Sequence, residues 1–347
     1  MPRAVVVISL VVAIVGGCSS QSVGRSPSPA ASRSLDATTS APSGAGTLTQ
    51  DQTIHVVSPF IAVATSAGVW VTSDKAVVHI DPTSGATTTI ATPIAAGSAS
   101  GLAASADDLW ESDFDTGDVE EVSVAAARVI ATVAVGQGPR GLFLDQSTPW
   151  VYREKATKEV SIDPVTARVR AAVAVPGPTG FAFGSWWSTS PDGGQLERLE
   201  NGTGRVTATI TVPSDAGACE FNPLPGLNPL GDALATFCLG DPAASRPKVA
   251  VIKVATNQVI ATVDPKGQPF GGSIVVDGRW WLIEGPMGGP GRVVRVDPTS
   301  WSIDRTLVVG PQFDPDAAVV AGGELYVPID PGQNLDEVLR FPLAALR

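Results

Sequence analysis

A repeat of about 40 residues is the feature that most constrains the fold of this chain. Between Gly136 and Val175, turn residues separate four short runs, GLFL, PWVY, EVSI and ARVRAAVAV. The segments before and after it, 97–135 and 176–212, have the same plan. Each run has the length and composition of a β-strand. Four strands in such a period predict the blades of an all-β protein, a β-propeller.

An aromatic residue recurs in the second strand of the repeats and allows the blades to be counted. The positions are Trp70, Trp110, Trp150, Trp187, Trp281 and Tyr326. The 94 residues from Trp187 to Trp281 leave room for one longer repeat, with Ala235 in the aromatic position and Phe237 beside it. The sequence therefore predicts a seven-bladed β-propeller over residues 51–347. Aromatic residues at this spacing are expected to pack between blades.

The last repeat lacks its fourth strand, because the chain ends within five residues of EVLRFP at 337–342. A matching strand pattern, QTIHVV at 52–57, precedes the first repeat. Its pairing into blade seven would remove an open sheet edge. We therefore expect the N-terminal strand to close the ring.

The N-terminus has the pattern of an export signal. Residues 1–17 have a basic start and an apolar run too short for a membrane-spanning helix. The ending VGGC resembles the lipobox of bacterial lipoproteins, which implies that Cys18 is lipidated. The lipid would then hold the protein on the outer side of the cytoplasmic membrane, in the bacterial cell envelope. An ordinary secretory signal that happens to contain Cys18 is the alternative.

Residues 18–50 are rich in Ser, Ala, Pro, Gly and Thr. Such a composition buries too little apolar surface to offset the entropy of ordering, so this segment is predicted to be a disordered tether. Cys219 and Cys238 remain after Cys18. An oxidising compartment and an even number suit one disulfide, and two buried thiols are the alternative.

The charge balance restricts the partners. Asp and Glu number 34 against 23 Lys and Arg, for a net charge of −11. This argues against nucleic acid and anionic lipid surfaces. We expect a monomer that binds a small polar ligand or a cell-envelope protein.

Turns of the type Asp-Pro-x-Thr/Ser follow the third strands, at Asp81, Asp163 and Asp297. An aspartate in this position accepts hydrogen bonds from backbone N–H groups two or three residues on. These carboxylates are therefore predicted to cap turns.

The turn Gly136-x-Gly138-Pro139-x-Gly141, the second-strand Trp and outer strands such as VIATVAV together resemble the seven-bladed YVTN-repeat propellers. That group is similar to virginiamycin B lyase and to the gluconolactonase-type hydrolases. The lyase resemblance implies a catalytic His and a bound Mg²⁺. His55 and His79 are the only histidines, and neither is expected near the centre of the ring.

Charged residues are expected at one end of the propeller, the top face. This end carries the connections from the second to the third strand of each blade and from the fourth strand to the first strand of the next blade. The predicted ligand-binding rim comprises Arg140, Arg153, Glu154, Glu111, Glu284, Asp314 and Asp316. Loop charges of this kind can also be merely solvated. The sharper interpretation is a carboxylate-rimmed site for a cation or a polar ligand.

The segment Asp113-Phe114-Asp115-Thr116-Gly117-Asp118 carries oxygen ligands on a short loop, as calcium loops do. Asp113, Asp115 and Asp118 are therefore candidate ligands for Ca²⁺ or Mg²⁺. The spacing departs from an EF-hand, and a polar turn is favoured.

The sequence contains no Gly-x-Ser-x-Gly nucleophile elbow, no His-Glu-x-x-His zinc-binding motif and no Walker phosphate-binding loop. We therefore expect a lipid-anchored binding or scaffold module. A metal-assisted propeller hydrolase or lyase with its site on the top face is the alternative.

Overall fold

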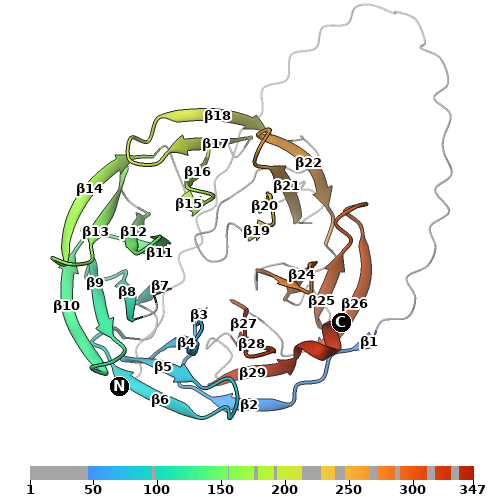
Figure 1. Cartoon of the computed structure of the whole chain (residues 1–347), viewed down its shortest axis with the longest axis horizontal. Helices are drawn as coiled ribbons and strands as arrows, with labels where there is room; N and C mark the ends of the chain where they lie inside the picture. Colours follow the sequence, from blue (N-terminus) through green and yellow to red (C-terminus); the bar gives the residue numbers. More distant parts are fainter. Residues whose placement is uncertain are drawn as a thin grey trace, which may run out of the picture. The chain divides into compact units, whose positions relative to one another are not determined.

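The computed structural model describes residues 46–95, 98–105, 107–154, 156–175, 179–190, 194–212, 228–238, 247–265, 272–285, 290–310, 317–329 and 336–347. The chain divides into two units, 1–41 and 42–347, and all described residues belong to the second. They form one five-stranded and six four-stranded sheets. Figure 1 shows these sheets arranged around a ring, with strands that follow one another outward from its centre. The predicted seven-bladed propeller is confirmed.

We call the strands of each blade a to d from the centre outward. Blade one contains β3 (Ala62–Thr65), β4 (Gly68–Ser73), β5 (Ala76–Ile80) and β6 (Thr87–Ala91). Blade two contains β7 (Ala99–Ala104), β8 (Asp108–Asp113), β9 (Asp118–Ser123) and β10 (Arg128–Ala134). Blade three contains β11 (Pro139–Asp145), β12 (Thr148–Arg153), β13 (Lys158–Asp163) and β14 (Arg168–Ala174).

Blades four and five contain β15 (Thr179–Ala182), β16 (Ser185–Thr189), β17 (Gln195–Glu200) and β18 (Val206–Thr211), then β19 (Asn228–Leu230), β20 (Ala233–Cys238), β21 (Lys248–Lys253) and β22 (Gln258–Val263). Blade six contains β23 (Ser273–Val276), β24 (Arg279–Glu284), β25 (Gly291–Val296), β26 (Ile303–Gly310) and β1 (Gly46–Thr47). Blade seven contains β27 (Val319–Ala321), β28 (Glu324–Pro328), β29 (Glu337–Pro342) and β2 (Gln52–His55), and a 3₁₀ turn, η3 (Leu343–Leu346), ends the chain.

The N-terminal strand closes the ring as predicted. Strand β2 pairs antiparallel with β29, from Gln52 opposite Arg340 to His55 opposite Glu337. An ion pair of 2.9 Å between Arg340 and Asp51 lies at one end of this pairing. Residues from the two ends of the described chain thus complete one blade, which leaves no three-stranded blade in the ring.

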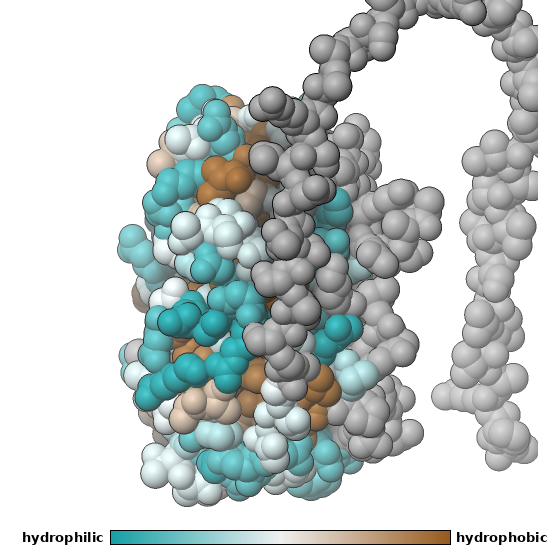
Figure 2. All heavy atoms as spheres, turned by 90° about the vertical axis from the view of Figure 1, so that its right-hand side faces the viewer, coloured by the Kyte–Doolittle hydropathy of each residue, from teal (hydrophilic) through white to brown (hydrophobic). Residues whose placement is uncertain are grey.

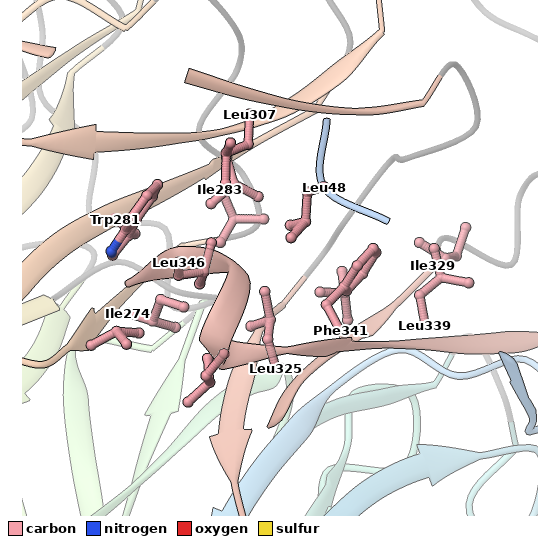
Figure 3. Close-up of a cluster of buried hydrophobic side chains, with 14 residues drawn as sticks. Leu48, Ile274, Trp281, Ile283, Leu307, Leu325, Ile329, Leu339, Phe341 and Leu346 are labelled. Atoms are coloured by element: carbon pink, nitrogen blue, oxygen red, sulfur yellow. The ribbon is translucent and has the colours of Figure 1, made fainter. Parts of the chain in front are cut away.

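The chain joins the propeller earlier than the sequence indicated. We expected the tether to extend to residue 50, but Gly46–Thr47 form β1, which pairs in parallel with β26 of blade six. Leu48 follows and is only 1% exposed. Figure 3 shows Leu48 between Ile283 of blade six and Phe341 of blade seven. The propeller therefore includes residues before position 51, where the sequence placed its start.

The aromatic residues of the b strands pack between blades, as expected. All six predicted anchors are buried. Trp150 contacts Trp186 of the next blade edge-on, with ring centroids 5.1 Å apart. At Ala235, which lacks a ring, Trp280 of blade six and Phe237 pack in the same cluster. The small residue is thus complemented by a large one on the neighbouring blade.

The aspartates of the third-strand turns act as predicted. Asp163 Oδ1 accepts hydrogen bonds from the backbone N–H groups of Val165 and Thr166, at 2.9 and 3.0 Å. Asp81 and Asp297 make the same pair of bonds in their turns. These bonds lower the pKa of all three carboxyls. The three aspartates stabilise hairpins at the end of the propeller opposite the top face.

Candidate functional site

The top of blade three brings together three of the predicted rim residues. Arg140 is the second residue of β11, and Arg153 is the last residue of β12. The two strands are antiparallel, with Pro139 opposite Arg153, so the start of one lies beside the end of the other. The N–H of Glu154 donates to the carbonyl of Gly138 at 2.9 Å, which holds Glu154 at this end of the blade.

Arg140 and Glu154 form an exposed ion pair. Arg140 Nη1 and Glu154 Oε2 are 2.6 Å apart, and their side chains are 43% and 39% exposed. The buried Tyr152 lies nearby, and burial together with Glu159 and Glu154 raises its pKa to about 12 while Arg140 opposes the shift. The phenol therefore stays protonated at neutral pH and keeps its O–H as a donor. An exposed cation and anion therefore lie near a buried phenol.

Arg153 has a different environment. Its guanidinium donates to the carbonyl of Val135 at 2.8 Å and to the carbonyl of Lys158. Val135 directly follows strand β10, so this side chain joins the outer strand of blade two to blade three. The backbone N–H of Arg153 donates to the fully buried Glu159 at 2.8 Å. Arg153 thus supports the scaffold under the Arg140–Glu154 pair.

Glu111 lies inside the protein. We expected it on a b–c loop at the rim, but it belongs to β8 and is 0% exposed. Leu109, two residues earlier and hence on the same face of the strand, packs with Trp70 of blade one. Glu111 therefore points into the interface between blades one and two. Neither carboxylate oxygen has a hydrogen-bond partner among the described residues.

Burial dominates the protonation of Glu111. It raises the pKa to about 8, the nearby Thr92 hydroxyl opposes the shift, and Glu120 and Asp113 add to it. Glu120 is opposite Glu111 on β9 and is itself buried, and its Oε2 accepts a hydrogen bond from Thr132 at 2.8 Å. Burial, with a smaller contribution from these neighbouring carboxyls, keeps Glu111 largely protonated at neutral pH.

Glu284 is also buried rather than exposed on a loop. It is the last residue of β24 and is 0% exposed, and it faces Arg292 on β25 with 4.0 Å between Oε2 and Nε. The pattern of charges near strand ends did not distinguish these two glutamates from Glu154, because burial depends on the adjacent blade. The predicted rim is therefore smaller than the sequence suggested.

The aspartates of the proposed calcium loop are used by the turn itself. Asp113 Oδ1 accepts hydrogen bonds from the N–H groups of Asp115 and Thr116, at 2.9 and 3.2 Å. Asp115 Oδ2 accepts one from the Ser98 hydroxyl at 2.6 Å. Asp118 begins β9 opposite Asp113. Within the residues that the structure describes, no group of three or more His, Cys, Asp or Glu is arranged to hold a metal.

Some predicted residues lie outside the described ranges, namely Cys18, Cys219, Asp314 and Asp316. Cys238 is buried at the end of β20. The histidines lie where the sequence indicated, with His55 on β2 and His79 on β5. His79 Nε2 is 3.0 Å from the carbonyl of Ala67.

Sequence reasoning missed the buried Glu120 and Glu159, both on c strands. The sequence carries little signal for their burial, because the runs in which they lie, DVEEVS and KEVSID, are mostly polar. No helix within the described ranges is long and apolar enough to cross a membrane.

Comparisons with known proteins support the assignment of the fold. No protein-family model matches the sequence, and no curated protein does. Among solved structures, hydrazine synthase of Kuenenia stuttgartiensis is similar with a TM-score of 0.63 and 12% identity, over 83% of this chain and 96% of that one. Streptogramin B lyase is similar with a TM-score of 0.63 and 15% identity, over 83% and 94%. The chain is a seven-bladed β-propeller. At these identities the likeness shows the fold alone.

Proposed function

We propose that this propeller is a binding module of the bacterial cell envelope. Lipidation of Cys18 would hold it on the outer side of the cytoplasmic membrane, and residues 18–45 would serve as the tether. The lipobox-like ending VGGC and the Ser-, Ala- and Pro-rich composition support this part of the proposal. A lipid anchor and a flexible tether suit a protein that presents a rigid domain to the space outside the membrane.

The exposed Arg140–Glu154 pair carries the proposal for a ligand site. Arg153 and Glu159 fix the scaffold below it, so the pair sits on a rigid base. An arginine fork binds a carboxylate or phosphate in two-point fashion, and Glu154 accepts hydrogen bonds from amines or hydroxyls. A small ligand with both kinds of group would replace the ion pair with two contacts of its own.

A second candidate is a hydrolase or lyase that uses a divalent cation on the top face. The fold similarity to streptogramin B lyase favours it. Asp113, Asp115 and Asp118 would supply oxygen ligands for Ca²⁺ or Mg²⁺ if the turn rearranged to release the backbone and Ser98. Because losing these hydrogen bonds would destabilise the turn, we favour the binding module over the metal-assisted enzyme.

A thermal-shift screen of the full-length protein tests both candidates. Divalent cations, sugars, lactones and small zwitterions would each be added, because a ligand of the folded state raises the Tm. The double variant Arg140→Ala/Glu154→Ala should abolish the shift from a polar ligand. The matched control, Arg205→Ala/Glu200→Ala, removes an exposed ion pair on the opposite face and should leave the shift unchanged.

A shift that survives loss of the Arg140–Glu154 pair would exclude this site. A shift produced by Ca²⁺ or Mg²⁺ alone, and lost in Asp113→Asn/Asp115→Asn, would favour the metal-assisted enzyme instead.

A further inference from the structure

The outer strand of blade three, β14, is unusually open. Its first five residues, Arg168 to Ala172, are all exposed, a longer run than in any other outer strand that the structure describes. Among the strands that the structure describes, β14 pairs with β13 alone. Its other edge therefore presents backbone N–H and C=O groups to the surroundings, as a sheet edge does when nothing covers it.

Two arginines give this edge a positive charge. Arg168 and Arg170 are exposed, and neither forms an ion pair with a described residue. The strand contains no acidic residue. Asp163, the last residue of β13, is opposite Arg168, accepts hydrogen bonds from the N–H groups of Val165 and Thr166, and has its pKa lowered in part by the charge of Arg170. The two arginines outnumber this one carboxylate. In a protein of net charge −11, β14 is thus a local positive site.

Exposed apolar side chains occur on β14, in the turn before it, and on the outer strands of the neighbouring blades. Val169 on β14 and Val165 in its turn are 43% and 92% exposed, and Ile130 on β10 and Val206 on β18 are similarly open. Figure 2 shows apolar patches among hydrophilic residues elsewhere on the outer wall. Arginine and β-branched residues together offer both charge and apolar contact to an extended chain.

Blade six shows that an outer edge of this propeller can accept a further strand. Strand β1 adds to β26 in parallel, with Gly46 opposite Leu307 and Thr47 opposite Val308. The next N–H, of Leu48, donates to the carbonyl of Val308 at 2.8 Å. The added strand is short and is secured by one buried apolar side chain. An edge in blade three has the same backbone groups but no such cover among the described residues.

We propose that β14 is a docking edge for an extended acidic segment of a partner protein, which adds to blade three as a fifth strand. A register shift at Arg170 interrupts the pairing with β13. The regular ladder available to the partner is therefore Ala171–Ala174. Backbone hydrogen bonds along it supply affinity, and Arg168 and Arg170 select acidic side chains at one end. This surface is separate from the Arg140–Glu154 pair.

A labelled peptide of alternating glutamate and valine tests the proposal by fluorescence anisotropy with the full-length protein. The peptide should bind, and Arg168→Glu/Arg170→Glu should weaken binding by about tenfold or more because like charges then oppose each other. Thr207→Glu/Thr209→Glu on β18, a matched control with two new carboxylates on the next outer strand, should bind as the wild type does. Arg140→Ala/Glu154→Ala should also bind normally.

A second peptide separates strand addition from simple attraction of charges. The same peptide with every backbone nitrogen methylated keeps the charge but has no backbone N–H donors for pairing with β14. It should not bind, and hydrogen exchange should show protection of β14 amides only with the first peptide. Equal binding of both peptides, equal binding by the β14 variant, or absence of binding by the wild type would each overturn the proposal. Adsorption to anionic vesicles without peptide binding would also overturn it.

Discussion

At the scale of the residue, the least expected feature is the number of buried carboxyls. Glu111, Glu120, Glu159 and Glu284 are all buried. Glu159 and Glu120 receive hydrogen bonds that offset the loss of hydration. Glu111 has no hydrogen-bond partner among the described residues, and its raised pKa shows how the protein accommodates it. A carboxyl that takes up a proton avoids the cost of a buried charge.

The pH dependence of stability follows from Glu111. Its pKa is about 8 in the folded protein against an ordinary value of 4.5. The folded state therefore holds a proton that the unfolded state releases, so stability falls as pH rises through this window. The slope from this one group is at most about 1.4 kcal/mol per pH unit. Glu111→Gln, which is neutral at every pH, should remove that slope and be more stable than the wild type near pH 8.

Urea unfolding at several pH values across this window would measure the effect, with the exposed Glu154→Gln as control. The control should reproduce the wild-type dependence. Parallel curves for wild type and Glu111→Gln would show that Glu111 ionises normally.

At the scale of the element, the two N-terminal strands serve different blades. Strand β2 completes blade seven, and β1 adds a fifth strand to blade six. The connection between them carries Leu48 into the cluster shared by both blades. The short segment from β1 to β2 thus links blade six to blade seven. A truncation made at residue 50 would keep the closing strand and lose this link.

Leu48→Ala should destabilise the propeller by about 2–5 kcal/mol, the range for removing a buried leucine side chain. The exposed Thr47→Ala is its control, because it leaves the pairing of β1 intact and should change little. Chemical denaturation of the two variants measures the difference. Equal stability would mean that Leu48 does not contribute to the core.

A disulfide between Cys219 and Cys238 remains a prediction at this scale. Cys238 ends β20 in a buried position. The bridge would close a loop of about 20 residues and stabilise the fold by roughly 3 kcal/mol in the chain-entropy model. Alkylation without reductant, followed by mass spectrometry, should find neither thiol modified in the exported protein. Modification of both would exclude the bridge.

At the scale of the whole molecule, the described residues form a ring of seven blades, and membrane anchoring is a prediction about residues 1–18. If Cys18 carries the lipid, Cys18→Ser should release the protein from membranes or leave it unprocessed. Cell fractionation and the mass of the N-terminal peptide would decide between these outcomes. Normal processing with unchanged membrane retention would contradict the lipoprotein proposal.

Patterns in the sequence were enough to predict the number of blades, the closing strand and the turn-capping aspartates. Each of these depends on patterns within one repeat: apolar runs of strand length, turn residues at fixed places, and an aspartate two or three residues before the donors that it binds. The tertiary structure alone decided which charges near the strand ends are exposed. Glu111 and Glu154 both lie at or near the end of a b strand, but only Glu154 reaches the surface.

Dependence on neighbouring blades also explains why the sequence did not predict the pairing of β1 or the open edge of β14. Whether a glutamate is buried, or an outer strand is covered, depends on side chains and backbone of a neighbouring blade or of a distant segment such as Gly46–Leu48. These partners share no local pattern with the residues they cover. Periodicity along the chain predicts the blades, and the packing of one blade on the next decides which polar residues remain accessible to a ligand.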